Sequence, residues 1–344
     1  MRVWFNRHLS VVTRITGLLR QAQFPITTLI SHRHSYFAGF TTADESFIEP
    51  AGLNSSDYTA WCLETARLHK VEWLVPSHDA AALAAAEASF NAIGVRLVNA
   101  ASADLVPRLH QKDWVYAHAP VSVPKPKFVV IAADAELEPA LALIEQTGPA
   151  CIKPCVSIYG HGYHRLSSRD RQDVSDIEPA QTDSTQQMNL TSWRARYSTP
   201  SPERRQLLME YLPGCEYSVD LACYRGEVLA GVSRRKSLTG PAQTIVDRAD
   251  LLEFCAQLVA AFGLHGLINV QFKDAHDGSP KLLEINPRAS GGIAMSCLSG
   301  LNLPLIAYQA CLQDGKRGLL PTPSYGIRVA EAPAAFIVPD WAPQ

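Results

Sequence analysis

Two strand-like runs joined by a turn constrain the fold of this 344-residue chain more than any other part of it. Residues 267–272 (Leu-Ile-Asn-Val-Gln-Phe) alternate apolar and amide side chains, and residues 282–288 (Leu-Leu-Glu-Ile-Asn-Pro-Arg) carry polar groups at alternate positions. The residues between them, 275–280, include Asp, Gly, Ser and Pro, which favour a turn. Because alternate residues of a strand point to the same side, we predict a β-hairpin with its polar side chains on one face.

The register of this hairpin decides whether those polar groups meet. A slip of one residue would send one set of them to the opposite face of the sheet. The predicted register has three pairs: Asp274 with Lys281, Gln271 with Glu284, and Asn269 with Asn286.

Glu284, Asn286 and Arg288 form a row with a defined chemistry. Magnesium in proteins is held by oxygen ligands, usually one or two carboxylates completed by water and by the phosphates of a substrate. Arginine matches phosphate with a planar fork of donors. The row therefore indicates a magnesium and phosphate site, and the alternative is an amphipathic hairpin whose polar face is simply hydrated.

The composition of the chain excludes several classes of partner. Apolar residues make up 47% and charged residues 19%, with a formal net charge of −2, so no overall charge attracts nucleic acid or an anionic membrane. No apolar run is long enough to span a bilayer, and residues 1–8 are too polar for a signal peptide. The eight cysteines include no CxxC pair, and we expect Cys151 and Cys155 to be reduced core residues of a cytoplasmic protein.

The first hundred residues predict a parallel sheet covered by helices, because strands and helices alternate along them. This region has no GxGxxG motif, so dinucleotide binding is not indicated. We predict strands at 3–5, 26–30, 71–75 and 95–98, a helix at 9–22, a helix capped by Ser55 or Ser56, and a helix capped by Asp79 that ends near Asn91.

The rest of the chain predicts a second, more antiparallel part after a proline-containing connection at 120–127. Residues 167–202 are polar, and we expect them to be mobile, with one short helix within 188–197. We further predict helices at 136–146, 250–262 and 302–312, and strands at 150–154, 207–212, 216–221, 327–329 and 335–338.

Several polar residues in this second part could contact a nucleotide. Lys153 ends a strand before a glycine-containing loop, where a lysine reaches phosphates and loop N–H groups surround them. The run Glu210-Tyr211-Leu212 could present backbone groups to an adenine, and Glu216 could accept hydrogen bonds from a ribose. The alternatives are a surface lysine before a turn and a half-buried strand whose acids are satisfied locally.

Taken in order, these residues resemble the ATP-grasp superfamily, and within it the branch of carbamoyl-phosphate synthetase and the carboxylate–amine ligases. The resemblance covers about residues 110–315, and the N-terminal sheet is similar to the domain that precedes the grasp. It is carried by Lys112, Lys153-Pro154, Gly160-x-Gly162, Glu210-Tyr211-Leu212-x-Gly214-x-Glu216, Asn269-x-Gln271 and Glu284-x-Asn286-Pro287-Arg288.

The resemblance implies a role for each matching residue. For ATP binding it implies Lys112 and Lys153, the loop residues Gly160, His161 and Gly162, and Glu210, Tyr211, Leu212 and Glu216. For magnesium it implies Glu284, Asn286 and Gln271. For stabilising the transferred phosphoryl group it implies Arg288, Asn269 and Lys236. Position 271 is Gln where many ligases have an acid, which is nearer the synthetase branch, and we name Ser77, His78, Arg234 and Ser290 as candidates for a substrate pocket.

The expected fold is α/β, an ATP-grasp fold preceded by a Rossmann-like parallel-sheet domain. The expected domains are residues 1–110 (N-terminal), 111–212 (glycine loop and mobile lid) and 213–344 (magnesium and phosphate site, with the tail). The expected cofactors are ATP and two Mg²⁺ ions, with Mn²⁺ as a substitute. The expected partners are a small carboxylate and an amine or amino acid, with no nucleic acid and no membrane, and a homodimer is compatible with the resemblance.

The function that the resemblance implies is an ATP-dependent ligase that acts through an acyl phosphate and releases ADP and phosphate. Closure of residues 155–205 over the site would keep water from the acyl phosphate. Three alternatives stay open: a carboxylase or carbamoyl-phosphate-type enzyme that activates bicarbonate, a kinase-like enzyme that stops at a phosphorylated product, and an ATP sensor without chemistry.

Overall fold

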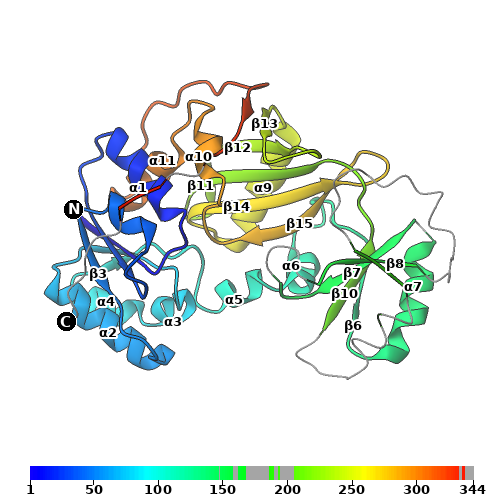
Figure 1. Cartoon of the computed structure of the whole chain (residues 1–344), viewed down its shortest axis with the longest axis horizontal. Helices are drawn as coiled ribbons and strands as arrows, with labels where there is room; N and C mark the ends of the chain where they lie inside the picture. Colours follow the sequence, from blue (N-terminus) through cyan, green and yellow to red (C-terminus); the bar gives the residue numbers. More distant parts are fainter. Residues whose placement is uncertain are drawn as a thin grey trace.

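The structure is a computed structural model, and it describes residues 1–146, 148–157, 162–167, 186–189, 193, 205–332 and 335–337. The described residues form three sheets, and the sheet built from the C-terminal part of the chain lies between the other two (Figure 1). We call them the N-terminal sheet, the small sheet and the large sheet. Within the described residues, no helix has the length and apolar character needed to cross a bilayer.

The N-terminal sheet is parallel throughout, in the order β3-β2-β1-β4-β5. The predicted parallel sheet with alternating helices is confirmed, although the sequence analysis missed β3. Its strands are β1 (Arg2–Asn6), β2 (Thr27–His32), β3 (Glu45–Ile48), β4 (Trp73–Val75) and β5 (Arg96–Leu97). Its helices are α1 (Val12–Gln21), α2 (Ser55–Leu68), α3 (Ala80–Ala85) and α4 (Glu87–Ala92), with a 3₁₀ turn η1 (Ala38–Thr42).

Of the two predicted helix caps in this domain, the first is one residue too late, and the second, Asp79, is at the predicted N-cap position but makes no side-chain bond. The cap of α2 is Asn54, whose side chain accepts a hydrogen bond from Asp57 N at 3.0 Å, one residue earlier than predicted. Asp79 precedes α3, but it has a left-handed backbone and its side chain makes no capping bond. The alanine-rich helix also breaks at Ala86, whose φ of −91° and ψ of 12° separate α3 from α4.

The small sheet has the order β6-β10-β7-β8-β9. The helix predicted within 188–197 is wrong at Met188, which lies in β9, whereas Trp193 is helical. Most of 167–202 lies outside the described residues. The strands are β6 (Phe128–Ile131), β7 (Ala150–Pro154), β8 (His164–Ser167), β9 (Gln186–Asn189) and β10 (Gln206–Glu210). Helices α5 (Leu105–Leu109) and α6 (Lys112–His118) lead into this sheet, and η2 (Asp134–Glu136) and α7 (Leu137–Glu145) follow β6.

The large sheet is antiparallel, in the order β15-β14-β11-β12-β13-β16. The strand predicted at 335–338 is wrong for 335–337, which are irregular. The strands are β11 (Glu216–Tyr224), β12 (Glu227–Lys236), β13 (Gln243–Val246), β14 (Gly266–Asp274), β15 (Pro280–Asn286) and β16 (Arg328–Val329). The helices are α9 (Ala249–Phe262), α10 (Ile293–Cys297) and α11 (Leu303–Leu312).

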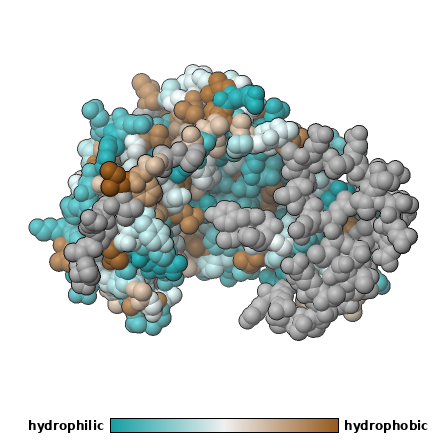
Figure 2. Space-filling model, in the orientation of Figure 1, coloured by the Kyte–Doolittle hydropathy of each residue, from teal (hydrophilic) through white to brown (hydrophobic). Residues whose placement is uncertain are grey.

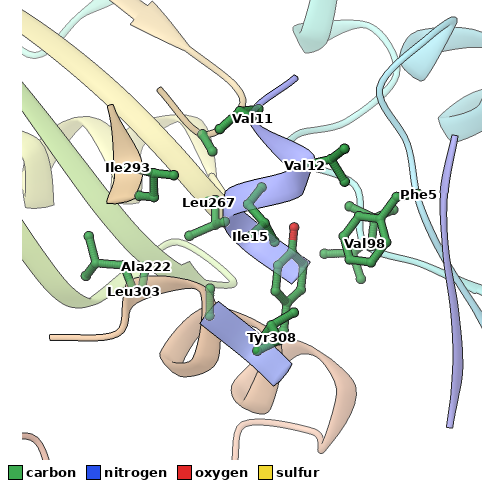
Figure 3. Packing of buried hydrophobic residues seen from close by; sticks show 14 of the residues in the cluster. Phe5, Val11, Val12, Ile15, Val98, Ala222, Leu267, Ile293, Leu303 and Tyr308 are labelled. Atoms are coloured by element: carbon green, nitrogen blue, oxygen red, sulfur yellow. The ribbon is translucent and has the colours of Figure 1, made fainter. Parts of the chain in front are cut away.

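One hydrophobic core joins the N-terminal sheet to the large sheet (Figure 3). Helix α1 contributes Ile15, α11 contributes Tyr308, and the large sheet contributes Ala222 and Leu267. The rings of Phe5 and Tyr308 meet edge to face at 5.7 Å, an arrangement that favours aromatic pairs. The two sheets therefore share a buried interface.

The face of the large sheet under α11 changes from apolar to polar along each strand. In β11, Ala222 belongs to the shared core, whereas Ser218 and Asp220, which have the same strand parity, are buried polar residues. In β14, Leu267 belongs to the core, and Asn269 continues the same row as a buried polar residue. The polar end of this face is where the predicted site lies.

Candidate functional site

The predicted hairpin exists, and its register at the site is the predicted one. Asn269 lies opposite Asn286, and Gln271 lies opposite Glu284. Asn286 Nδ2 donates to Glu284 Oε1 at 3.0 Å, and Gln271 Nε2 donates to Asn269 Oδ1 at 3.4 Å. The four polar side chains that the alternating pattern placed together therefore share one face.

The register near the turn is not the predicted one. Lys281 pairs with Lys273 instead of Asp274, because Leu283 is an extra residue in β15 and forms a β-bulge. The Leu283 carbonyl accepts a hydrogen bond from Tyr116 Oη at 2.8 Å, which satisfies the group that the bulge removes from the ladder. The bulge also lets Leu282 face the core although it has the same parity as the site residue Glu284.

The two predicted lysines lie beside this hairpin. Lys112, the first residue of α6, contacts both the site and the loop after β7. Its Nζ is 3.6 Å from Glu284 Oε2 and donates to the Ser157 carbonyl at 2.9 Å. Lys153 is buried in β7, with Nζ 5.9 Å from the centre of the Tyr116 ring. Burial, and then the charge of Lys112, lowers the pKa of Lys153 to about 8, so an anion beside this ammonium would be strongly favoured.

Arg288 lies just beyond the hairpin and is held by its neighbours. Its Nη1 donates to the Ala289 carbonyl at 3.1 Å and its Nη2 to Asn286 Oδ1 at 3.4 Å. The guanidinium is therefore next to the amide that the sequence assigns to magnesium, as the alternating spacing implies.

Lys236, the last residue of β12, donates a hydrogen bond from Nζ to Oε1 of Glu216, the first residue of β11. Among the described residues, no hydrogen bond or ion pair joins Lys236 to Asn269 or Arg288. The three residues predicted to act on the phosphoryl group are thus not one hydrogen-bonded cluster in this state.

The run from Glu210 to Leu212 lies at the end of β10. Some of its polar groups already make hydrogen bonds with neighbouring residues. Glu210 Oε1 accepts from Lys127 N at 3.0 Å, and Tyr211 N donates to the Pro149 carbonyl at 2.8 Å. Leu212 is buried, and in the described part of the chain nothing accepts from its N–H. Of this run, the Leu212 backbone is the group that is left to bind an adenine edge.

The glycine loop is described only in part. Gly160 and His161 lie outside the described residues. Gly162 has a φ of +77°, and a Cβ there would come within 2.9 Å of the Pro154 ring, so this position requires glycine.

A buried ion pair under the site was missed by the sequence analysis as a pair. Arg234 Nη2 and Asp220 Oδ2 are 2.8 Å apart, and both residues are fully buried. Asp220 Oδ1 also accepts from Asn269 Nδ2 at 3.0 Å, while Arg234 Nη2 donates to Ser290 Oγ at 2.9 Å. At Gly292 a Cβ would lie 2.6 Å from Arg234 Nη1, so the loop after the hairpin is fitted closely around the guanidinium.

A cavity of about 920 Å³ opens next to Arg288. The loops after β1, β2 and β4 form one side of it, and residues 287–289 with β14 form the other. Figure 2 shows hydrophilic residues at the hollowed middle of the molecule. Of the four pocket candidates, Ser77 and His78 line the cavity, whereas Arg234 and Ser290 bond to each other beneath the loop.

The donor set at the hairpin fits magnesium only together with phosphates. It offers one carboxylate, Glu284, and the amides of Asn286 and Gln271, and the described residues contain no cluster of three or more His, Cys, Asp or Glu suited to a metal. Because Lys112 also approaches Glu284, the protein alone supplies little negative charge. This set suits a Mg²⁺ that arrives with ATP, whose phosphates complete its coordination.

Comparisons with known proteins find similar sequences and similar folds. The model of a family described as "ATP-grasp in the biosynthetic pathway with Ter operon" matches residues 203–335. A segment is 34% identical over 141 residues to carbamoyl phosphate synthase large chain of Clostridium beijerinckii, covering 37% of this chain and 13% of that protein. Another is 40% identical over 98 residues to carnosine synthase 1 of Gallus gallus, covering 25% of this chain and 10% of that one. The matches thus span about an eighth of these relatives or less.

Solved structures resemble the whole chain. An ADP complex of N5-carboxyaminoimidazole ribonucleotide synthetase has a TM-score of 0.67 at 11% identity, covering 95% of this chain and 80% of that one. The biotin carboxylase domain of a Hydrogenobacter thermophilus 2-oxoglutarate carboxylase, with MgADP and bicarbonate, also has a TM-score of 0.67, at 13% identity, covering 95% of this chain and 73% of that one. At these identities the likeness establishes the fold.

Proposed function

Because the chain belongs to the ATP-grasp superfamily, we propose that it is an ADP-forming ligase that joins a carboxylate to an amine or another nucleophile through an acyl phosphate. The observation that carries this proposal is the hairpin register, which brings Glu284, Asn286 and Gln271 together beside Arg288 and Lys112. A carboxylate, amides and cations in one place suit the triphosphate of Mg-ATP.

The proposed reaction has two steps. A carboxylate oxygen of the substrate attacks the γ-phosphorus, the bond to the β-phosphate oxygen breaks, and ADP leaves. The nucleophile then attacks the acyl carbon of the acyl phosphate and inorganic phosphate leaves. Phosphoryl transfer needs chiefly positioning and charge stabilisation from a protein.

The residues divide these tasks. Arg288, on the boundary between hairpin and cavity, would hold the transferred phosphoryl group, with Asn269 and Lys236 assisting. Lys112 and Lys153 would bind the phosphates. Mg²⁺, two ions in our proposal, would neutralise phosphate charge while held by Glu284, Asn286 and Gln271.

The nucleoside end of ATP is assigned by the same argument. The Leu212 N–H is the free backbone group of its run, so we assign it to adenine, with Glu210 and Tyr211 beside it. Glu216 would accept from the ribose, which requires it to loosen its bond to Lys236. The loop containing Gly160, His161 and Gly162 would cover the phosphates. These roles accompany proposed domains of residues 1–110, 111–212 and 213–344.

Activation of bicarbonate is the second candidate. It is favoured by the likeness to carbamoyl phosphate synthase and to a biotin carboxylase domain crystallised with bicarbonate. The size of the cavity favours an organic acid, because bicarbonate would fill a small part of about 920 Å³.

Phosphorus NMR of the protein with Mg-ATP tests the proposal. We expect ADP and phosphate to form when a pool of amino acids and small carboxylates is added, and splitting the pool then identifies the substrates. AMP and pyrophosphate would contradict acyl-phosphate chemistry. Turnover with bicarbonate alone would favour the second candidate, and Mg-ATP binding without any turnover would favour a sensor.

A further inference from the structure

Loops of the N-terminal sheet form one wall of the cavity beside Arg288. Hydrogen bonds to a buried side chain hold these loops in place. Asn6, buried at the end of β1, donates from Nδ2 to the His78 carbonyl at 3.0 Å and accepts from Ser77 N at 2.8 Å. The loop after β4 is thereby held against the loop after β1. The side chains on this wall are therefore placed by a buried anchor.

Hydrogen bonds within the wall leave histidine donors without partners. Arg7 Nη1 is 2.7 Å from His78 Nε2, and since a guanidinium can only donate, the proton of the His78 ring lies on Nδ1. By the same reasoning Arg33 Nε, 3.0 Å from His34 Nε2, leaves the His34 proton on Nδ1. His32 Nδ1 accepts from His34 N at 3.1 Å, which leaves its Nε2–H. Among the described residues nothing accepts from these three ring N–H groups.

The charged residues around the cavity are mostly cations. Arg7, Arg33 and Arg288 line it, and Asp79 is its single acidic lining residue among those described. Glu49 offsets Arg7 through a 2.5 Å contact with Nε, but the guanidinium keeps Nη2 without a described partner. Free donors and excess positive charge both call for a ligand rich in acceptors.

Burial first, and then nearby positive charge, lowers the pKa of two histidines that line the cavity. The pKa of His32 is lowered to about 4, mainly by burial and then by His34, with smaller contributions from Arg7 and Arg33. The pKa of His78 is also lowered, by burial and then by Arg7. Both rings are therefore neutral donors at pH 7, and neither needs to lose a proton when an anion enters.

Backbone strain supports a binding role for the same wall. Arg7 has a φ of +36° and Asp79 a φ of +51°, a region that side chains other than glycine rarely adopt. Such conformations cost free energy and are enriched at functional sites. Both residues line the cavity.

The lining of the cavity also includes apolar residues, among them Ile15, Val98 and Leu267. Arg288 would hold the reacting carboxylate at one end, as in the proposed function on which this inference rests. We propose that the acid substrate carries a second anionic group, a carboxylate or a phosphate, that binds Arg33, Arg7 and the free histidine N–H groups at the other end.

Binding measured without turnover tests this proposal. Isothermal titration calorimetry of the full chain would compare succinate, glutarate and adipate with butyrate, pentanoate and hexanoate of matching length. We expect at least one diacid to bind about tenfold or more tightly than its monoacid, because a second ion pair forms with Arg33 and the half-buried Arg7. A phosphonate in place of the distal carboxylate, as in 5-phosphonopentanoate, then shows which anion is preferred.

One variant and one control connect the preference to the wall. Because Arg33 is exposed, the Arg33→Gln variant should fold normally. We expect it to lose most of the preference for diacids over monoacids. Arg20→Gln removes an arginine that is bonded to the Thr42 carbonyl and does not line the cavity, and it should keep the preference. Equal affinity for diacid and monoacid at every length, or a preference that survives in Arg33→Gln, would refute the proposal.

ADP release in the same samples separates this inference from the proposed function. Selective diacid binding without ADP from any acid or amine would count against the ligase reaction and leave the anion site standing. Turnover that is equally efficient with monoacids would count against the anion site and leave the ligase reaction standing.

Discussion

The hairpin β14–β15 and the loops after β1, β2 and β4 face the same central space but are built in different ways. The hairpin sets its polar groups by strand alternation, so Glu284 and Asn286 share a face over two residues of sequence. The loops bring together Arg7, Arg33 and His78, which are far apart in the chain, at the carboxyl ends of parallel strands. Strand alternation allows the grouping of the hairpin residues to be predicted from the sequence. The grouping of the loop residues can be predicted only once the strand order is known.

The largest expected effect is on the hairpin carboxylate. Glu284→Gln keeps the shape of the side chain but removes the one charge offered to Mg²⁺, so we expect kcat to fall about 10³-fold, or about 4 kcal/mol. ADP release under saturating substrates measures it. Glu227→Gln, which removes an exposed acid of the same sheet paired with Arg317, is the matched control. Near-normal turnover in Glu284→Gln would place the chemistry elsewhere.

The next effect is on stability under the hairpin. Arg234→Met leaves Asp220 buried without its cation, and we expect the free energy of unfolding to fall by about 3 kcal/mol or more. Urea unfolding followed by circular dichroism measures this. Adding Asp220→Leu to the same chain should recover part of the loss, because the uncompensated charge is then gone. A double variant no more stable than the single one would show that hydrogen bonds to the pair matter more than its charge.

A smaller effect concerns pH. Lys153 has its pKa lowered from 10.5 to about 8, so its ammonium loses its proton as the pH rises through 8 instead of near 10. Because phosphate needs the ammonium form, we expect affinity for Mg-ATP to fall about tenfold between pH 7 and pH 9. In Lys153→Arg the guanidinium stays charged, so the affinity should be flat over this range. A wild-type affinity that is also flat would remove Lys153 from the phosphate site.

The smallest effect tests the bulge. Tyr116→Phe removes the hydrogen bond to the Leu283 carbonyl, and we expect a loss of about 1 kcal/mol in the free energy of unfolding. Tyr325→Phe, at an exposed tyrosine, serves as the control and should have no measurable effect. If the two variants are equally stable, the bulge is held by packing alone.

Much of the fold could be predicted because it follows from periodic patterns. The parallel N-terminal sheet and the site register of the hairpin came from alternation and turn residues, and both are confirmed. The error at Lys281 arose because a regular ladder was assumed. Two successive leucines, Leu282 and Leu283, were a visible sign that the alternation breaks, since both are apolar next to a row of polar residues.

What could not be predicted depends on contacts between distant segments. Nothing in the sequence near Asp220 indicates that Arg234 pairs with it, because the pairing follows from the β11–β12 register. The sequence pattern does not single out Arg7, Arg33 or His34. Only the strand order brings them to one wall of the cavity. Strand β3 was missed because Glu45–Ile48 is short and not strongly apolar, so the neighbouring strand decides its conformation.

The bulge has a consequence for how the site responds to motion. Helix α6 contacts two successive residues of β15: Lys112 at its start approaches Glu284, and Tyr116 one turn later bonds to Leu283. The helix cannot slide along its axis without stretching both contacts at once. We therefore expect a displacement of the segment before α6 to move the carboxylate that is proposed to hold the metal.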